Sequence, residues 1–173
     1  TNAQDCKACY YLGNFLYARQ RYDEAVQMWQ RALPDLRDFD VIYRNLGLAA
    51  WQRHADMPTA TELLEKALQL NPRNQDLYIL LDDLYKAQEM PEKRASLLGA
   101  IEALPELRED VRKRKIMMLV DLGRYNDALA IMQTEKFVPL EMDQSFHDLY
   151  VRALMQRAAD ALQAGNVDDA IRD

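Results

Sequence analysis

The chain has 173 residues, of which 49% are hydrophobic and 29% charged, a balance typical of a folded domain with a sizeable core. No apolar run approaches the roughly 18 residues of a membrane span, and no signal-peptide pattern is present, so we expect no membrane partner and favour a cytoplasmic location. The net charge of −6 argues against a general nucleic-acid binder, which usually needs a basic domain or stripe.

The start of the chain predicts two helices. Apolar residues recur at spacings of three and four over about 5–19, which indicates a helix. A polar break over 19–21 separates it from a second helix that begins near Tyr22. Pro34 ends this second helix, because proline lacks a backbone N–H and its ring clashes with the preceding turn. The apolar residues of the two helices are Ala8, Cys9, Leu12, Phe15 and Leu16, then Ala25, Met28, Trp29, Ala32 and Leu33.

The next two helix pairs repeat this plan. Asp40 is the predicted N-cap of the third helix, because its carboxylate can accept hydrogen bonds from the free N–H groups of the first turn. Pro58 and Pro91 suit the first turns of the fourth and sixth helices, where a missing N–H costs nothing. The third pair is expected over about 75–105.

A fourth pair and an incomplete fifth follow. The turn at Gly123, which ends a predicted helix over about 109–122, resembles in sequence the turn that precedes Tyr22. It returns at Gly165, 42 residues later, and the stretch 142–163 before it contains no helix breaker. We therefore expect a fifth repeat with an extended first helix and a truncated second one.

The spacing of these elements indicates a repeat array. Leu12-Gly13 recurs 34 residues later as Leu46-Gly47, and the second helices share a pattern of small and large residues. A period near 34 built from two helices is typical of stacked helix-turn-helix repeats, since one hairpin cannot bury its own apolar face. We predict an all-α solenoid of about five stacked hairpins in a single domain. Its repeats are placed at about 6–39, 40–74, 75–107, 108–141 and 142–173.

The residues of the first repeat resemble the tetratricopeptide repeat (TPR). The matching residues are Cys9, Leu12, Gly13, Tyr22, Ala25, Trp29 and Ala32. The resemblance implies a right-handed solenoid whose first helices line a concave side. The amino-acid sequence of residues 5–14 and 43–49 is also similar to the TPR segment of large bacterial proteins with a β-rich, mutarotase-like region upstream. On that comparison the chain is a segment excised from a longer protein that acts on or near sugars.

The resemblance places a partner-binding groove along the first helices. Tyrosine, tryptophan, arginine and asparagine suit such a surface, because they combine rigid contact area with directed hydrogen bonds. In this family, asparagines such as Asn14 and Asn45 often hold the backbone of a bound peptide. The alternative for the aromatic residues is packing against the next repeat. The predicted groove residues are Tyr10, Asn14, Tyr17, Arg44, Asn45, Trp51, Lys86 and Lys113.

The sequence shows no catalytic motif, and no cofactor is expected. Cys6 and Cys9 form an isolated CxxC without the four ligands of a zinc site or the preceding strand of a redox site, so Cys9 is predicted to fill a core position. The basic cluster over 108–115 is diluted by acidic residues and is expected to face solvent.

We therefore predict a non-catalytic module that binds a peptide or protein domain in its concave groove. The alternative is an accessory region packed permanently against a carbohydrate-active β-rich domain of the same protein, with no separate ligand. An uncapped solenoid end exposes apolar surface, so a homodimer through the C-terminal repeat is a further expectation.

Overall fold

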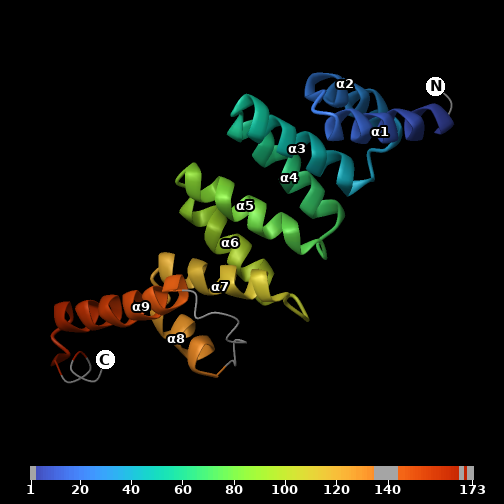
Figure 1. Ribbon diagram of the computed structural model, residues 1–173. Helices are drawn as coiled ribbons and strands as arrows, with labels where there is room; N and C mark the ends of the chain where they lie inside the picture. Colours follow the sequence, from blue (N-terminus) through green and yellow to red (C-terminus); the bar gives the residue numbers. More distant parts are fainter. Residues whose placement is uncertain (1–2, 135–143, 168–169, 171–173) are drawn as a thin grey trace. The chain divides into compact units, whose positions relative to one another are not determined.

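The computed structural model describes residues 3–134, 144–167 and 170, and every regular element in these ranges is a helix (Figure 1). The predicted all-α fold is thereby confirmed. The helices are α1 (Ala3–Ala18), α2 (Tyr22–Ala32), the 3-10 turn η1 (Leu33–Asp35), α3 (Asp40–His54), α4 (Met57–Leu70), α5 (Gln75–Ala87), α6 (Pro91–Glu102), α7 (Glu109–Asp121), α8 (Tyr125–Thr134) and α9 (Gln144–Gln163). No helix among the described residues is both long enough and apolar enough to cross a membrane.

The chain divides into two compact units, Thr1–Lys93 and Arg94–Asp173. The first unit contains α1 to α5 and the first turn of α6, and the second contains the rest of α6 with α7 to α9. The arrangement of all five repeats as a single domain stays a prediction.

The first helix of every pair ends in a left-handed turn residue. These residues are Gln20, Ala55, Glu89, Gly123 and Gly165, with φ between 52° and 80°. Four of the five turns share a hydrogen bond from the residue that follows to the carbonyl five positions earlier, such as Arg21 N to Leu16 O at 2.9 Å. This is the Schellman pattern, which satisfies carbonyls at a helix end. In α3 the bond from Asp56 N reaches Ala50 O, six positions back.

The N-terminal ends of α3 and α4 differ from each other. Asp56 caps α4 by accepting a hydrogen bond from Thr59 N at 3.1 Å, and Pro58 lies in the first turn as predicted. The predicted N-cap of α3 is wrong, because Phe39 occupies that position and Asp40 is the first helical residue. The Asp40 carboxylate instead accepts hydrogen bonds from Asn71 and Asn74, which follow α4.

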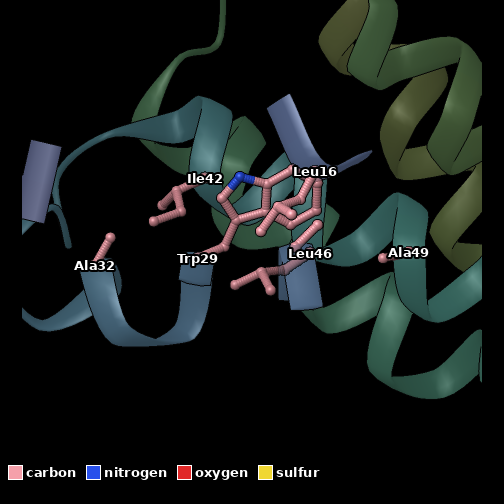
Figure 2. Close-up of a cluster of buried hydrophobic side chains, with 7 residues drawn as sticks. Leu16, Trp29, Ala32, Ile42, Leu46 and Ala49 are labelled. Atoms are coloured by element: carbon pink, nitrogen blue, oxygen red, sulfur yellow. The ribbon is translucent and has the colours of Figure 1, made fainter. Parts of the chain in front are cut away.

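The core of the first unit forms around Trp29 (Figure 2). One glycine in each of the first two hairpins lets the paired helices approach closely. A Cβ at Gly13 would lie 2.5 Å from Trp29 Nε1, and one at Gly47 would lie 2.9 Å from Leu64 Cγ. Small residues at the crossing therefore make room for one large side chain from the second helix. The buried residues of this cluster are Leu16, Ala25, Trp29, Ala32, Ile42, Leu46 and Ala49.

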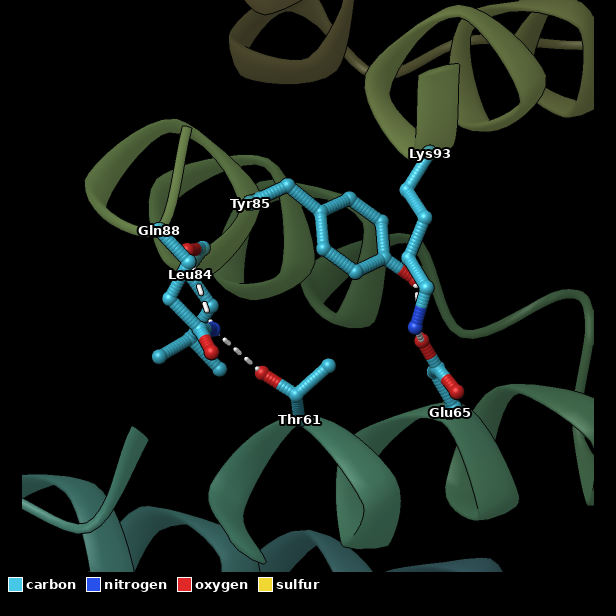
Figure 3. Close-up of polar contacts among 6 residues, drawn as sticks. All are labelled: Thr61, Glu65, Leu84, Tyr85, Gln88 and Lys93. Carbon is cyan, nitrogen blue, oxygen red and sulfur yellow. Dashed lines mark hydrogen bonds and ion pairs between the residues drawn. The ribbon is translucent and has the colours of Figure 1, made fainter. Parts of the chain in front are cut away.

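Polar contacts join α4 to α5 and to the first turn of α6 (Figure 3). The buried Thr61 hydroxyl accepts a hydrogen bond from Gln88 Nε2 at 2.7 Å. Tyr85 donates from its hydroxyl to Glu65 Oε1 at 2.8 Å, and Lys93 Nζ lies 2.7 Å from the same oxygen. Burial raises the pKa of Tyr85, and the hydrogen bond to the Glu65 carboxylate raises it further.

The second unit has its own core and one buried ion pair. Arg94 is 7% exposed, and its Nη2 lies 3.2 Å from Asp121 Oδ2. Arg152 of α9 approaches the other oxygen of Asp121 at 3.2 Å, so the carboxylate joins α6, α7 and α9. The buried hydrophobic residues of this unit are Leu97, Leu98, Ile101, Val111, Ile116, Met118, Leu119, Val120, Ala128, Leu129, Leu149 and Ala153.

Two large residues predicted for the packed face of α1 lie elsewhere. Leu12 and Phe15 are 46% and 54% exposed, because no described helix covers their side of α1. Cys9 is half-buried and packs against the core cluster, in agreement with its predicted position, and Cys6 is 2% exposed. The basic cluster over 108–115 is mostly exposed or half-buried, in agreement with the expected solvated surface.

Candidate functional site

Six of the eight predicted groove residues lie on α1 and α3, the first helices of the first two hairpins. Tyr10, Asn14 and Tyr17 follow one side of α1 at spacings of four and three, and all three are half-buried. On α3, Arg44 and Trp51 take the places of Tyr10 and Tyr17. Asn45 takes the place of Tyr11, and all three residues of α3 are half-buried as well. We call these six residues the α1–α3 face.

Two asparagines connect the helices of this face. Trp29 Nε1 donates to Asn14 Oδ1 at 3.0 Å, and Asn45 Nδ2 donates to the same oxygen at 3.2 Å. An indole N–H can only donate, so the Asn14 amide must present its oxygen to Trp29, and Asn45 must then present its nitrogen to Asn14. Both amide orientations therefore follow from the buried tryptophan.

This arrangement leaves one donor and one acceptor unused. In the described part of the chain, Asn14 Nδ2 and Asn45 Oδ1 have no hydrogen-bond partner. The free groups come from neighbouring first helices that are held in register by the bond between the two amides. A peptide unit needs such a pair, because it offers one carbonyl acceptor and one N–H donor.

Arg44 carries a charge without a counter-charge. Its Nε is buried, and across the described ranges the guanidinium makes no hydrogen bond and no ion pair. A half-buried guanidinium has lost part of its hydration, and its planar donors match a carboxylate. The side chain is therefore suited to an incoming anionic group.

The two tyrosines of the face contact other aromatic rings. The centroid of the Tyr17 ring lies 5.4 Å from the ring centroid of Trp29 and 5.0 Å from that of Tyr22. The Tyr17 hydroxyl donates a hydrogen bond to Gln52 Oε1 at 3.2 Å. The Tyr10 ring lies 5.3 Å from Phe39 in an edge-on arrangement. Packing against neighbouring elements and partial exposure thus occur together in these tyrosines.

The remaining two predicted residues are not part of this face. Lys113 belongs to the second unit, where its Nζ lies 3.0 Å from Glu109 Oε1 one helical turn away. Lys86 is exposed on the last turn of α5 and is not among the contacts that connect α1 with α3.

The polar role of Trp29 was not predicted from the sequence. Its spacing on α2 predicts a gap-filling core residue, which is correct for the ring, since Trp29 is 2% exposed. Its N–H also orients the amides on the surface. The available signal was that a buried indole N–H needs an acceptor, and Asn14 is a polar residue directly beside Gly13.

Other chemistry is not supported at the described positions. These residues contain no group of three or more His, Cys, Asp or Glu side chains placed to hold a metal ion. Cys6 and Cys9 form no disulfide in the described structure, and Cys6 donates a hydrogen bond to Asp35 Oδ2 at 2.5 Å. This bond raises the pKa of the Cys6 thiol and opposes formation of the thiolate, which is the nucleophile in redox exchange.

Comparison with known families and structures gives the same repeat. Residues 7–37 match the family model of the tetratricopeptide repeat. Solved TPR-like structures align with nearly the whole chain. YrrB, described as a TPR protein with an unusual peptide-binding site, has a TM-score of 0.67 and 22% identity, with 99% of this chain and 84% of that chain covered. MamA has a TM-score of 0.61 and 15% identity over 99% of this chain and 88% of its own.

A third match is pilF of Pseudomonas aeruginosa, with a TM-score of 0.57 and 17% identity over 97% of this chain and 66% of that chain. At these identities the likeness establishes the fold, which is that of a TPR solenoid.

Proposed function

We propose that the α1–α3 face binds an extended, acidic peptide segment of a protein partner. The observation that carries this proposal is the pair of unused amide groups, Asn14 Nδ2 and Asn45 Oδ1, on neighbouring first helices. A peptide carbonyl would accept from Asn14, and a peptide N–H would donate to Asn45. Both amides are already oriented before binding, which reduces the entropy lost on association.

The other residues of the face supply contact area and charge selection. The half-buried rings of Tyr10, Tyr17 and Trp51 offer rigid apolar surface that loses little side-chain freedom on binding. Arg44 would pair with a carboxylate of the peptide and gain the partner that it lacks among the described residues. The face therefore favours peptides with an aspartate, a glutamate or a terminal carboxylate.

The proposal can be tested with an array of extended eight-residue peptides synthesised as matched glutamate and glutamine pairs. Affinities of the best pair are then measured by fluorescence polarisation with the whole chain. Loss of a charge-assisted hydrogen bond of about 1.5–3 kcal/mol corresponds to an affinity loss of about ten- to a hundredfold. We expect Arg44→Gln to produce such a loss for the glutamate peptide and little change for the glutamine peptide.

Two further variants separate the parts of the site. Asn45→Ala removes the free acceptor but leaves the hydrogen bond between Trp29 and Asn14, so it should weaken both peptides equally. Arg73→Gln alters an exposed arginine outside the face and serves as the matched control. An array without any binder, or equal losses in the Arg44 and Arg73 variants, would contradict the proposal.

A second candidate function is permanent docking against another domain of the same protein, for example the β-rich, carbohydrate-active region that the sequence resemblance implies. It is favoured by the exposed apolar side chains on α1. Docking of that kind does not use Arg44, so Arg44→Gln would leave it intact. A pull-down that compares Arg44→Gln with Phe15→Asp in the full-length protein distinguishes the two functions.

A further inference from the structure

One side of α1 exposes a stripe of apolar residues. Tyr11, Leu12 and Phe15 are 67%, 46% and 54% exposed, and Ala8 of the same stripe is exposed as well. Their spacing of three and four residues places them together along the helix. The Arg19 guanidinium lies 5.1 Å from the centre of the Phe15 ring and extends the stripe by one turn. We call these residues the α1 outer stripe.

The repeat plan shows what this stripe lacks. On α3 the equivalents of Ala8, Leu12 and Phe15, 34 positions later, are at most 6% exposed and belong to the core cluster with Trp29 of α2; they are Ile42, Leu46 and Ala49. The equivalent of Tyr11 is the half-buried Asn45. The corresponding leucines of α5 are 0% exposed: Leu77, Leu81 and Leu84. In both cases the second helix of the preceding hairpin contacts the stripe, as α2 does for α3 and α4 for α5. The α1 outer stripe thus has the character of an interface between helices.

We propose that the α1 outer stripe binds the same stripe of a second copy of this chain, with the two α1 helices antiparallel across a two-fold axis. The side-chain sizes support this arrangement. Small Ala8 and large Phe15 lie on either side of Tyr11 and Leu12. An antiparallel pair centred on Tyr11 and Leu12 places Phe15 of each copy against Ala8 of the other, so both copies use the same surface.

The charges at the two ends of the stripe support the same geometry. Asp5 is exposed near the N-terminal end of α1, and Arg19 is exposed just beyond its C-terminal end. Antiparallel packing brings Asp5 of each copy near Arg19 of the other, whereas parallel packing would place like charges together. Opposite charges across an interface also fix its register.

The size of the stripe limits the strength of the dimer. A helix of 16 residues is about 24 Å long, so a single helix pair covers less than the roughly 1,200 Å² of a stable complex. The dimer is therefore expected to be weak and to form as concentration rises. This interface does not include Asn14, Asn45 or Arg44, so it stands or fails independently of peptide binding.

Sedimentation velocity from about 5 μM to 1 mM, with the whole chain, tests the inference. We expect a monomer–dimer equilibrium that Phe15→Asp abolishes. The matched control is Met155→Asp, which changes a 68% exposed residue of α9 and should leave the equilibrium unchanged. Circular dichroism of each variant confirms that the helices are intact.

Charge reversal supplies a second test that does not disturb the apolar stripe. Asp5→Arg places two cations together at each end of the pair and is expected to weaken the dimer about five- to tenfold at low salt. Combining it with Arg19→Asp should restore association to within about twofold of the starting value.

Three results would overturn the inference. If the chain is monomeric at 1 mM, the stripe does not bind a second copy, and its partner would be a helix of another polypeptide. A dimer lost with Met155→Asp rather than Phe15→Asp would place the contact at the C-terminal repeat. Failure of the double reversal to restore association would exclude the antiparallel register.

Discussion

Replacing Gly13 with alanine adds a methyl group where α1 crosses α2. The new Cβ would lie 2.5 Å from Trp29 Nε1, 2.6 Å from Trp29 Cδ1 and 3.2 Å from Ala25 O. The indole is 2% exposed, and its N–H donates to Asn14, so it cannot move aside without disturbing both the core and this hydrogen bond. The substitution is therefore a direct test of the close crossing.

The magnitude follows from three opposing contributions. Alanine gains about 1 kcal/mol over glycine within a helix. Overpacking a core costs about 1–3 kcal/mol, and weakening the bond to Asn14 costs about 0.5–1.5 kcal/mol more. We expect Gly13→Ala to lower the free energy of unfolding by about 0.5–3.5 kcal/mol in total.

Two other glycines provide graded controls. Alanine at Gly47 meets Leu64 Cγ at 2.9 Å, but this aliphatic side chain has no hydrogen bond to lose, so the cost should be smaller. Gly99 has no neighbouring atom within 4 Å, and Gly99→Ala should stabilise the chain by up to about 1 kcal/mol.

Urea unfolding measures these effects. Both tryptophans lie in the first unit, so their fluorescence follows the Gly13 and Gly47 variants, while circular dichroism follows Gly99→Ala. The reasoning is refuted if Gly13→Ala is as stable as the unmodified chain, or if Gly47→Ala is the more damaging of the two.

Three further substitutions test single contacts. The pKa of Tyr85 is raised in the folded chain by burial and by its bond to Glu65, so its stabilising contribution is complete below pH about 10 and is lost as the pH rises toward the folded value. The melting temperature of Tyr85→Phe should therefore fall less steeply above that pH than the melting temperature of the unmodified chain. Asp56→Ala removes the cap of α4 and should cost about 0.5–2 kcal/mol in urea unfolding, and an unchanged midpoint would disprove the role of the cap. Arg94→Ala removes a buried partner of Asp121 and should cost about 1–3 kcal/mol by circular dichroism, more than Arg94→Met, which keeps the apolar stem.

The sequence predicts the hairpins because their signals are local. Leu46-Gly47 and the small residues of the second helices determine how closely paired helices approach, and the prolines at 58 and 91 mark helix starts. The turns are conserved in conformation even where glycine is absent, since Gln20 adopts the left-handed backbone that Gly123 adopts. Local spacing was sufficient for these features.

Features that depend on neighbours could not be predicted in the same way. Leu12 and Leu46 have the same sequence environment, yet they are 46% and 6% exposed, because α2 covers the Leu46 side of α3 and no described helix covers the Leu12 side of α1. Asp40 has the chemistry of an N-cap but is bound by two asparagines some 30 positions later. Arg44 is likewise unpaired because no carboxylate lies near it in the described structure. A sequence motif cannot show which residues lie nearby in space.

The hydrogen bond from Trp29 to Asn14 joins the interior of the first unit to its surface. An event at the surface amide must alter the electronic environment of the indole proton, although the ring itself never meets solvent. The indole resonance in an NMR spectrum is therefore a built-in reporter of occupancy, available without any label attached to the chain.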